Sequence, residues 1–177
     1  MKSTKIFLGI IGLSILGMIL WFGIGMINDS IKESKFSNYE IPDYIILNKP
    51  IKNFNRRQID SLQKLRVEKN KLELNGQLGS YGFFMWYKPT EKGEIYVRAF
   101  EIAKNIELSR DELYDGTRNK IEKSTNKMTI YEGSSTIYEG TFEVFFPVRF
   151  ELWFKSEKSG KEIKLAEKEY LIEGWDR

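Results

Sequence analysis

Residues 144–155, VFFPVRFELWFK, form the clearest strand pattern in the sequence and decide the fold. Successive side chains of a strand point to opposite faces, so residues two apart share a face. One face of this segment is entirely apolar and comprises Val144, Phe146, Val148, Phe150, Leu152 and Phe154. A face of six apolar side chains predicts a core strand and places the chain in the mainly β class.

The residues that follow predict an antiparallel partner for this strand. Residues 156–161, SEKSGK, have the composition of a turn, and residues 162–173 then return. The returning segment also fits a helical stripe, which would hold Ile163, Ala166, Tyr170 and Leu171. The turn before it and the closing Gly174-Trp175 favour a strand over a helix.

On the N-terminal side, residues 129–140, TIYEGSSTIYEG, carry the same five residues twice at a spacing of seven. An odd spacing puts the two copies on opposite faces of a continuous strand, so one strand cannot bury both copies alike. We therefore favour a turn at Ser134-Ser135 over a continuous strand.

Further apolar segments upstream predict the other strands. Residues 81–88, YGFFMWYK, and 95–103, IYVRAFEIA, flank a connection with proline and glycine, which predicts that they pair as a hairpin. Residues 65–74 predict either a short hairpin or one kinked strand. Residues 44–47 lie between two prolines and predict a strand at an edge.

One short helix is expected within this domain. Ser109 and Glu112 match a capping box, which predicts a helix from about Arg110 to near Gly116. About seven strands joined by short turns predict an antiparallel β-sandwich of immunoglobulin-like type, which we favour over a small barrel. The immunoglobulin-like assignment rests on strand number, because the chain has no cysteine for the hallmark disulfide.

Near the N-terminus, residues 6–27, IFLGIIGLSILGMILWFGIGMI, contain 22 residues without a charge. A helix of this length covers roughly 33 Å, enough for the hydrocarbon core of a bilayer. The stretch is too long for a typical signal peptide and no A-x-A site follows it, so an uncleaved anchor is favoured over cleavage. We expect a leader at 1–5, a transmembrane helix at 6–27, a juxtamembrane stalk and basic segment at 28–64, and a β-sandwich at 65–177.

The orientation of this anchor depends on the flanking charges. Lys2 and Lys5 on one side equal Lys32 and Lys35 on the other, and the terminal amine tips the balance toward an N-terminus inside the cell. We therefore expect a single-pass protein of the bacterial inner (plasma) membrane, with its C-terminal domain outside the cytoplasm.

Two missing residue types narrow the possible chemistry. The chain has no cysteine, which excludes disulfides and thiol nucleophiles, and no histidine, which removes the commonest general base and metal ligand. Lys2 and Lys5 are two of the 28 basic residues, which leaves 26 against 25 acidic residues in the rest of the chain. This balance argues against nucleic acid as a partner. We expect no metal, no cofactor and no enzymatic activity.

A first set of candidate binding residues lies in the aromatic segment 81–88. Aromatic side chains occupy both faces of this predicted strand, so one face is a candidate surface for binding a protein or glycan. Tyr81, Phe83 and Trp86 are the candidates. Packing into the core is the alternative interpretation, and we favour it over a binding surface.

A second set lies in the repeat and in a basic segment. Tyr131 and Tyr138 occupy matching positions in the two copies of the repeat. Residues 49–71, which include Arg56 and Arg57, hold eight basic side chains against two acidic ones. This segment predicts either a patch for anionic lipid or an acidic partner, or simply a solvated face.

Three segments together carry a resemblance to known sequences: GEIYVRAFEIAKNIELS at 93–109, TIYEG at 136–140 and FELWFKSEKSGKEIKLAEKEYLIEGW at 150–175. With them the chain resembles small, uncharacterised bacterial membrane-anchored proteins that have an N-terminal span and a C-terminal β domain. The doubled TIYEG departs from the single copy expected in that group. The resemblance implies no activity, substrate or catalytic residue.

These observations favour a membrane-anchored binding module that contacts another protein and has no chemistry of its own. An immunity or inhibitor role in the cell envelope is one form of this hypothesis. The alternative is a histidine-free hydrolase that uses carboxylates, with Glu132, Glu139 and Asp111 as its candidates. A concave pocket that holds two carboxylates with a raised pKa would discriminate between them.

Overall fold

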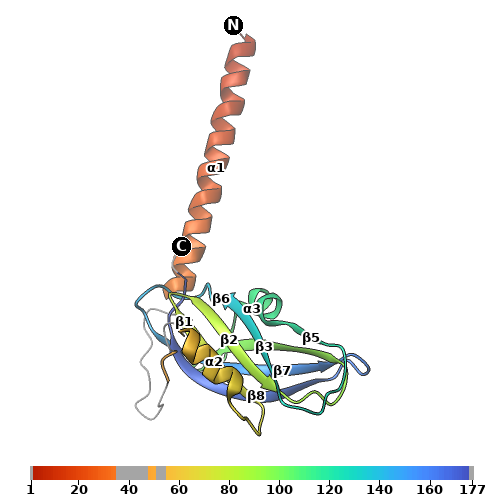
Figure 1. The fold of residues 1–177 in the computed structure, drawn as a ribbon. Helices are drawn as coiled ribbons and strands as arrows, with labels where there is room; N and C mark the ends of the chain where they lie inside the picture. Colours follow the sequence, from red (N-terminus) through yellow and green to blue (C-terminus); the bar gives the residue numbers. More distant parts are fainter. Residues whose placement is uncertain (1, 35–47, 51–54, 176–177) are drawn as a thin grey trace.

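The computed structural model describes residues 2–34, 48–50 and 55–175, without the side chains of 2–11, 28–29, 32–34 and 56. Within these residues the chain is mainly β, with eight strands in antiparallel sheets and three helices (Figure 1). The helices are α1 (Lys2–Ser34), α2 (Arg56–Lys64) and α3 (Arg110–Thr117). The strands are β1 (Lys71–Gln77), β2 (Ser80–Tyr87), β3 (Gly93–Glu101), β4 (Glu107–Leu108), β5 (Asn119–Ile121), β6 (Thr129–Thr136), β7 (Phe146–Ser156) and β8 (Glu162–Ile172).

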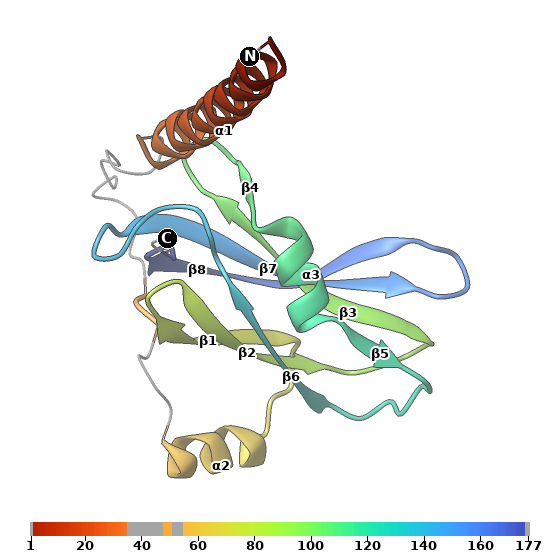
Figure 2. The same cartoon turned by 90° about the horizontal axis from the view of Figure 1, so that it is seen from above.

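The strands form two sheets around one core. The smaller sheet has the order β1-β2-β6, and the larger has the order β4-β3-β7-β8, with β5 also paired to β3. All these pairs are antiparallel. Helix α2 lies on the side of the smaller sheet that faces away from the larger one (Figure 2). The narrower immunoglobulin-like assignment stays a prediction.

Strand β7 is the centre of the larger sheet, and its apolar face is the core face. Five of its side chains are at most 2% exposed: Phe146, Val148, Phe150, Leu152 and Phe154. The ring of Phe150 contacts that of Phe83 on β2, with 5.7 Å between the centroids, so the two sheets meet directly. Burying a side chain of this kind stabilises the fold by about 1.5–3 kcal/mol. The predicted core strand is confirmed from Phe146 onward, whereas Val144 precedes the strand and is half-buried. The predicted return of residues 162–173 is confirmed as β8.

Tyrosine and carboxylate side chains close one edge of the two sheets, between β1 and β8. The hydroxyl of Tyr170 accepts the backbone N–H of Leu74 at 3.1 Å and donates to Glu73 Oε2 at 3.0 Å. Lys168 Nζ donates to the same carboxylate at 2.6 Å. Burial acts to raise the pKa of Glu73, but hydrogen bonds from Lys168, Lys71 and Tyr170 hold it below the ordinary value.

Helix α3 closes the opposite edge, between β3 and β6. The Thr117 hydroxyl accepts the backbone N–H of Val97 at 2.8 Å and donates to the Leu113 carbonyl at 2.6 Å. A Cβ atom at Gly133 would lie only 2.7 Å from the Thr117 Cα, so the glycine permits this close approach of β6 to the helix.

The predicted hairpin between residues 81–88 and 95–103 is wrong. Strand β2 pairs with β1 and β6, whereas β3 pairs with β4, β5 and β7, so the two segments belong to different sheets. The connection that begins at Pro89 carries the chain across the core, and the Pro89 carbonyl accepts the N–H groups of Thr125 and Asn126. Turn residues predicted a reversal of the chain but could not predict which strand edges pair.

The predicted turn at Ser134-Ser135 is also wrong. Strand β6 runs from Thr129 through both serines to Thr136, and the second copy of the repeat begins at this last residue of the strand. The two copies therefore have different surroundings: Ile130 is half-buried, whereas Ile137 is fully buried. Pairing of residues 129–136 with β2 along its whole length stabilises the continuous strand.

The helix predicted after Ser109 is confirmed as α3, but its capping box is not formed. Ser109 has φ 37° and ψ 50°, a left-handed conformation, and its side chain makes no capping hydrogen bond. Its hydroxyl instead donates to Glu139 Oε2 at 2.6 Å. Helix α2 was not predicted, although Asn55 and Gln58 form a complete capping box at its start.

The N-terminal helix extends beyond the predicted span at both ends, from Lys2 to Ser34. Among the residues whose side chains are described, no helix has an apolar stretch long enough to cross a membrane. The span at 6–27 therefore stays a prediction. The edge strand predicted at 44–47 lies outside the described residues. Asn48, next in the chain, forms a parallel bridge with Tyr170 of β8.

Candidate binding surface

The outer face of the larger sheet presents arginine and aromatic side chains in alternation. Because inward and outward residues alternate, the core positions of β3 and β7 leave their neighbours on the opposite face. This outward set consists of Tyr96, Arg98 and Phe100 on β3 and Arg149, Glu151 and Trp153 on β7. Helix α3 lies beside this set, where its Tyr114 ring packs on Tyr96, and helix α2 lies on the outer side of the other sheet (Figure 2).

Four of these side chains stack into an arginine–aromatic ladder, in the order Trp153, Arg98, Phe100, Arg149. The guanidinium of Arg98 lies 5.3 Å from the Trp153 ring centroid and 5.0 Å from that of Phe100. The guanidinium of Arg149 lies 5.5 Å from the same Phe100 ring. Each cation therefore lies within the 6 Å range of a favourable cation–π contact.

Two carboxylates fix the guanidinium groups of the ladder. Arg98 Nε donates to Glu107 Oε1 at 2.7 Å, and this bond raises the pKa of Arg98. Arg149 Nε donates to Glu151 Oε1 at 2.8 Å, and Arg149 Nη2 donates to Asn105 Oδ1 at 3.0 Å. Stacked and paired in this way, the planar groups are held in one orientation.

Glu151 is the most buried charge on this face, with a side chain 5% exposed. It accepts hydrogen bonds from Arg149 Nε, from Trp153 Nε1 at 2.9 Å and from Lys164 Nζ at 3.3 Å. Burial acts to raise the pKa of Glu151, but these three hydrogen bonds outweigh it and lower the pKa. The carboxylate is therefore charged at neutral pH and holds the Trp153 ring in place.

A pocket of about 240 Å³ lies beside the ladder, between the sheet and α3. Its lining combines three cations, three anions and two tyrosines: Arg98, Arg110, Lys155, Glu107, Asp111, Glu162, Tyr96 and Tyr114. The rings of Tyr96 and Tyr114 meet edge to face at 5.0 Å, and the Tyr114 hydroxyl donates to Glu94 at 2.6 Å. Burial and the neighbouring Glu162 raise the pKa of Tyr96. The volume suits one side chain or a small polar group, below the 300–1,000 Å³ of a typical ligand pocket.

This arrangement is suited to recognition. Arginine, tryptophan and tyrosine are the residue types that dominate binding energy at protein interfaces, where they are enriched. Among the described residues, no group of three or more acidic side chains is placed to hold a metal ion. The expectation that the chain uses no metal stays a prediction.

The aromatic residues predicted as an exposed binding face are buried. Tyr81 is 2% exposed and Phe83 1% exposed, and both belong to the core between the sheets. Trp86 is 2% exposed on the other face of β2, where Lys71 Nζ lies 5.6 Å from its ring. The expected exposure is therefore wrong for these three residues, and core packing is correct for Tyr81 and Phe83. Their role in binding stays a prediction.

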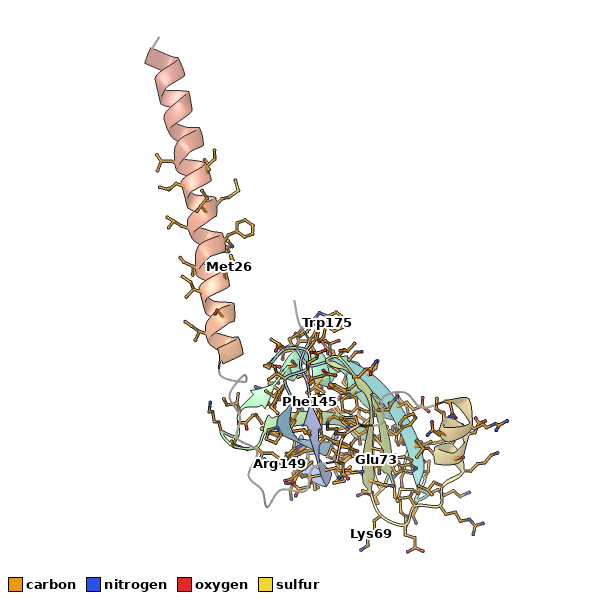
Figure 3. The ribbon with its side chains drawn as sticks, turned by 90° about the vertical axis from the view of Figure 1, so that its left-hand side faces the viewer. Met26, Lys69, Glu73, Phe145, Arg149 and Trp175 are labelled. Carbon is orange, nitrogen blue, oxygen red and sulfur yellow. The ribbon has the colours of Figure 1, made fainter. Side chains whose placement is uncertain are left out.

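The remaining predicted residues are scattered over the molecule. Tyr131 is half-buried against the core, and Tyr138 is 39% exposed at the end of the domain where β6 ends. Arg57 is exposed on α2, and the side chain of Arg56 lies outside the described residues. Figure 3 places Lys69 of the basic segment at the end of the β domain far from α1. The structure does not bring these residues together with the ladder.

The three acids of the hydrolase hypothesis have separate surroundings. Glu132 accepts a hydrogen bond from Gln63 of α2 at 3.3 Å. Glu139 uses both oxygens to bind Ser109, accepting its backbone N–H at 2.9 Å and its hydroxyl. Asp111 alone lines the pocket, beside Glu107 and Glu162, neither of which had been predicted.

The residues of the ladder were missed, although their signal was present. The alternation of residues 95–103 and 144–155 predicted which side chains share a face on each strand. Joining Arg98 to Trp153 also required the pairing of β3 with β7, which places Tyr96 opposite Trp153 and Phe100 opposite Arg149. Figure 3 shows Arg149 on the larger sheet and Glu73 on the smaller one.

The resemblance described above receives no support from other proteins and stays a prediction. No protein-family model, curated protein or solved structure matches this chain.

Proposed function

We propose that this protein is a membrane-anchored module that binds another protein through the outer face of its larger sheet. Helix α1 is its single span, the β domain lies outside the cytoplasm of a bacterial cell, and the protein performs no catalysis. The observation that carries the binding proposal is the arginine–aromatic ladder on the outer face of the larger sheet, beside the pocket that α3 borders.

Support for the anchor comes from α1, which stands apart from the β domain (Figure 1). Eleven large apolar side chains between 13 and 27 are at least 52% exposed: Leu13, Ile15, Leu16, Met18, Ile19, Leu20, Trp21, Phe22, Ile24, Met26 and Ile27. These residues lie all around the helix, and a helix that is apolar all round is typical of a membrane span or a buried helix. The sequence extends this uncharged run back to Ile6.

Support for a protein partner comes from the chemistry of the ladder and its pocket. The guanidinium groups are already oriented, so a partner's carboxylate or backbone carbonyl meets donors that lose little entropy on binding. The pocket carries both signs of charge and can accept one polar side chain as an anchor. An immunity or inhibitor role in the envelope is one form of this function.

Affinity capture from detergent extracts, with three single variants of the full-length protein, tests this proposal. Arg98→Glu and Trp153→Ala each disrupt the ladder, whereas Ile163→Ser changes an apolar residue that is 44% exposed outside the ladder and its pocket. A partner retained by wild type and Ile163→Ser and lost from both ladder variants supports the proposal. Equal recovery by all folded variants overturns it.

A fusion of alkaline phosphatase after Arg177 tests the proposed orientation. Active phosphatase is the expected result, because the enzyme folds only outside the cytoplasm, where its disulfides form. Inactive fusion protein present at the same level in the membrane fraction would place the β domain inside the cell.

A further inference from the structure

Exposed apolar side chains gather at the end of the β domain where three loops meet. Leu78 lies in the turn between β1 and β2, Tyr138 follows β6, and Trp175 follows β8. They are 40%, 39% and 40% exposed, respectively. We refer to these three residues, together with Phe142, as the apolar end.

Backbone hydrogen bonds hold the three loops together. The Ile137 N–H donates to the Gly79 carbonyl at 2.8 Å, and the Trp175 N–H donates to the Ile137 carbonyl at 2.7 Å. The Phe142 ring packs edge to face on the Trp175 ring, with 5.7 Å between the centroids. The exposed rings are therefore fixed to the β domain.

The buried carboxylate of Glu173 also links the loops of the apolar end. It accepts the backbone N–H of Leu78 at 2.9 Å and that of Glu143 at 2.8 Å, which joins the first and second loops to the end of β8. Backbone donors therefore satisfy both carboxylate oxygens of Glu173.

The apolar end lies at the end of the domain that faces α1. Figure 3 shows Trp175 there and Lys69 at the opposite end. The path of the chain agrees with this position of the apolar end. Asn48, which follows α1 in the sequence, accepts the N–H of Leu171 with its carbonyl, and Leu171 lies four residues before Trp175. Thirteen residues separate Ser34 from Asn48, and they reach roughly 45 Å at most.

We propose that the apolar end docks on the lipid surface around α1, an inference that rests on the proposed anchor. Tryptophan and tyrosine favour the interface between head groups and acyl chains, where the ring is apolar and its polar atom stays hydrated. Lys49 Nζ lies 4.6 Å from the Phe145 ring and adds a cation for anionic head groups, while exposed Glu143 opposes it. Apolar contact therefore provides most of the attraction.

Fluorescence quenching of the full-length protein in nanodiscs tests this docking. Each variant carries a fluorophore on one introduced cysteine, since the chain has no cysteine of its own. Ser80→Cys reports beside the apolar end, Ser159→Cys reports in the turn between β7 and β8, and Ile24→Cys reports within α1. Nitroxide carried on lipid head groups should quench the Ser80→Cys label at least about twofold more than the Ser159→Cys label. Nitroxide on acyl chains should quench the Ile24→Cys label.

The outcomes separate the docking from the anchor. Equal quenching at Ser80→Cys and Ser159→Cys, with strong quenching at Ile24→Cys, overturns the docking and leaves the anchor in place. No quenching at Ile24→Cys overturns the anchor and the docking with it. Adding both Trp175→Ser and Tyr138→Ser should reduce the quenching at Ser80→Cys to the level at Ser159→Cys, whereas adding Ile163→Ser should not. Unchanged quenching at Ser80→Cys in the folded protein that carries both serine substitutions also overturns the docking.

Discussion

The guanidinium of Arg98 lies 5.3 Å from the centroid of the Trp153 ring on the neighbouring strand. The two residues are diagonal neighbours, because Tyr96 is the residue directly opposite Trp153. Arg98 is held from a third strand by Glu107, and Trp153 is held by Glu151. A contact supported from both sides in this way should be measurable as a coupling energy.

A double-mutant cycle of Arg98→Ala and Trp153→Ala tests that contact. We expect a coupling of about 0.5–1 kcal/mol in the free energy of unfolding, since the pair is partly exposed to solvent. Urea unfolding of the wild type, both single variants and the double variant measures it. Strict additivity of the two single changes would mean that the ring and the cation are neighbours without interaction.

Tyr170→Phe should destabilise the protein by about 1–3 kcal/mol, because it leaves the buried N–H of Leu74 without an acceptor. Lys123→Ala is the control, since Lys123 is exposed and should tolerate the change within about 0.5 kcal/mol. Thermal unfolding monitored by circular dichroism compares the two variants. If Tyr170→Phe were as stable as Lys123→Ala, the proposed closure between β1 and β8 would be incorrect.

Stability should fall in acid because the pKa values of Glu73 and Glu151 are lowered by folding. A carboxyl with a lowered pKa stabilises the folded chain fully above its unfolded pKa, about 4.3 for glutamate. That stabilisation is lost as the pH falls through the lower folded-state pKa, since protonation then removes the ion pairs.

Urea unfolding between about pH 6 and pH 3 measures this dependence. Glu151→Gln should flatten the loss of stability with falling pH, because the group no longer titrates. Glu122→Gln is the control, since Glu122 forms an ion pair with Lys120 in which both side chains are at least two-thirds exposed. An unchanged slope in Glu151→Gln would show that its ion pairs do not stabilise the folded state.

Gly79→Ala should cost more stability than Gly160→Ala, although both glycines have a left-handed backbone, with φ +72° and +67°. Either change incurs a backbone cost of about 1–2 kcal/mol. At Gly79 the new Cβ would also lie 2.3 Å from the Trp175 backbone nitrogen, whereas nothing lies within 4 Å at Gly160. Equal unfolding free energies for the two variants would contradict the close contact of these loops.

The parts of the fold that could be predicted from the sequence are those set by local pattern. The period-two alternation of residues 144–155 predicted the core face of β7, and the SEKSGK turn predicted its pairing with β8. Helix α2 was missed because four of its nine residues are charged, which favoured an interpretation as a basic stalk. Its capping box of Asn55 and Gln58 was the available signal.

The candidate site could be predicted only in part, because it depends on contacts between distant segments. Arg98 and Trp153 are 55 positions apart, and only the pairing of β3 with β7 makes them neighbours. The aromatic segment 81–88 was misleading for a related reason: side chains on both of its faces are buried, and one face packs in the core between the sheets. Composition cannot distinguish such double burial from an exposed aromatic face.

Photo-crosslinking in living cells tests most directly the central claim that the ladder face contacts another protein. A photoreactive amino acid replaces Arg110 or Lys155, which line the pocket without belonging to the ladder, and replaces exposed Lys123 as a control. We predict one common crosslinked protein from Arg110 and Lys155, none from Lys123, and loss of the crosslink when Trp153→Ala is added. Equal crosslinking at all three positions, or none at Arg110 and Lys155, would contradict the claim.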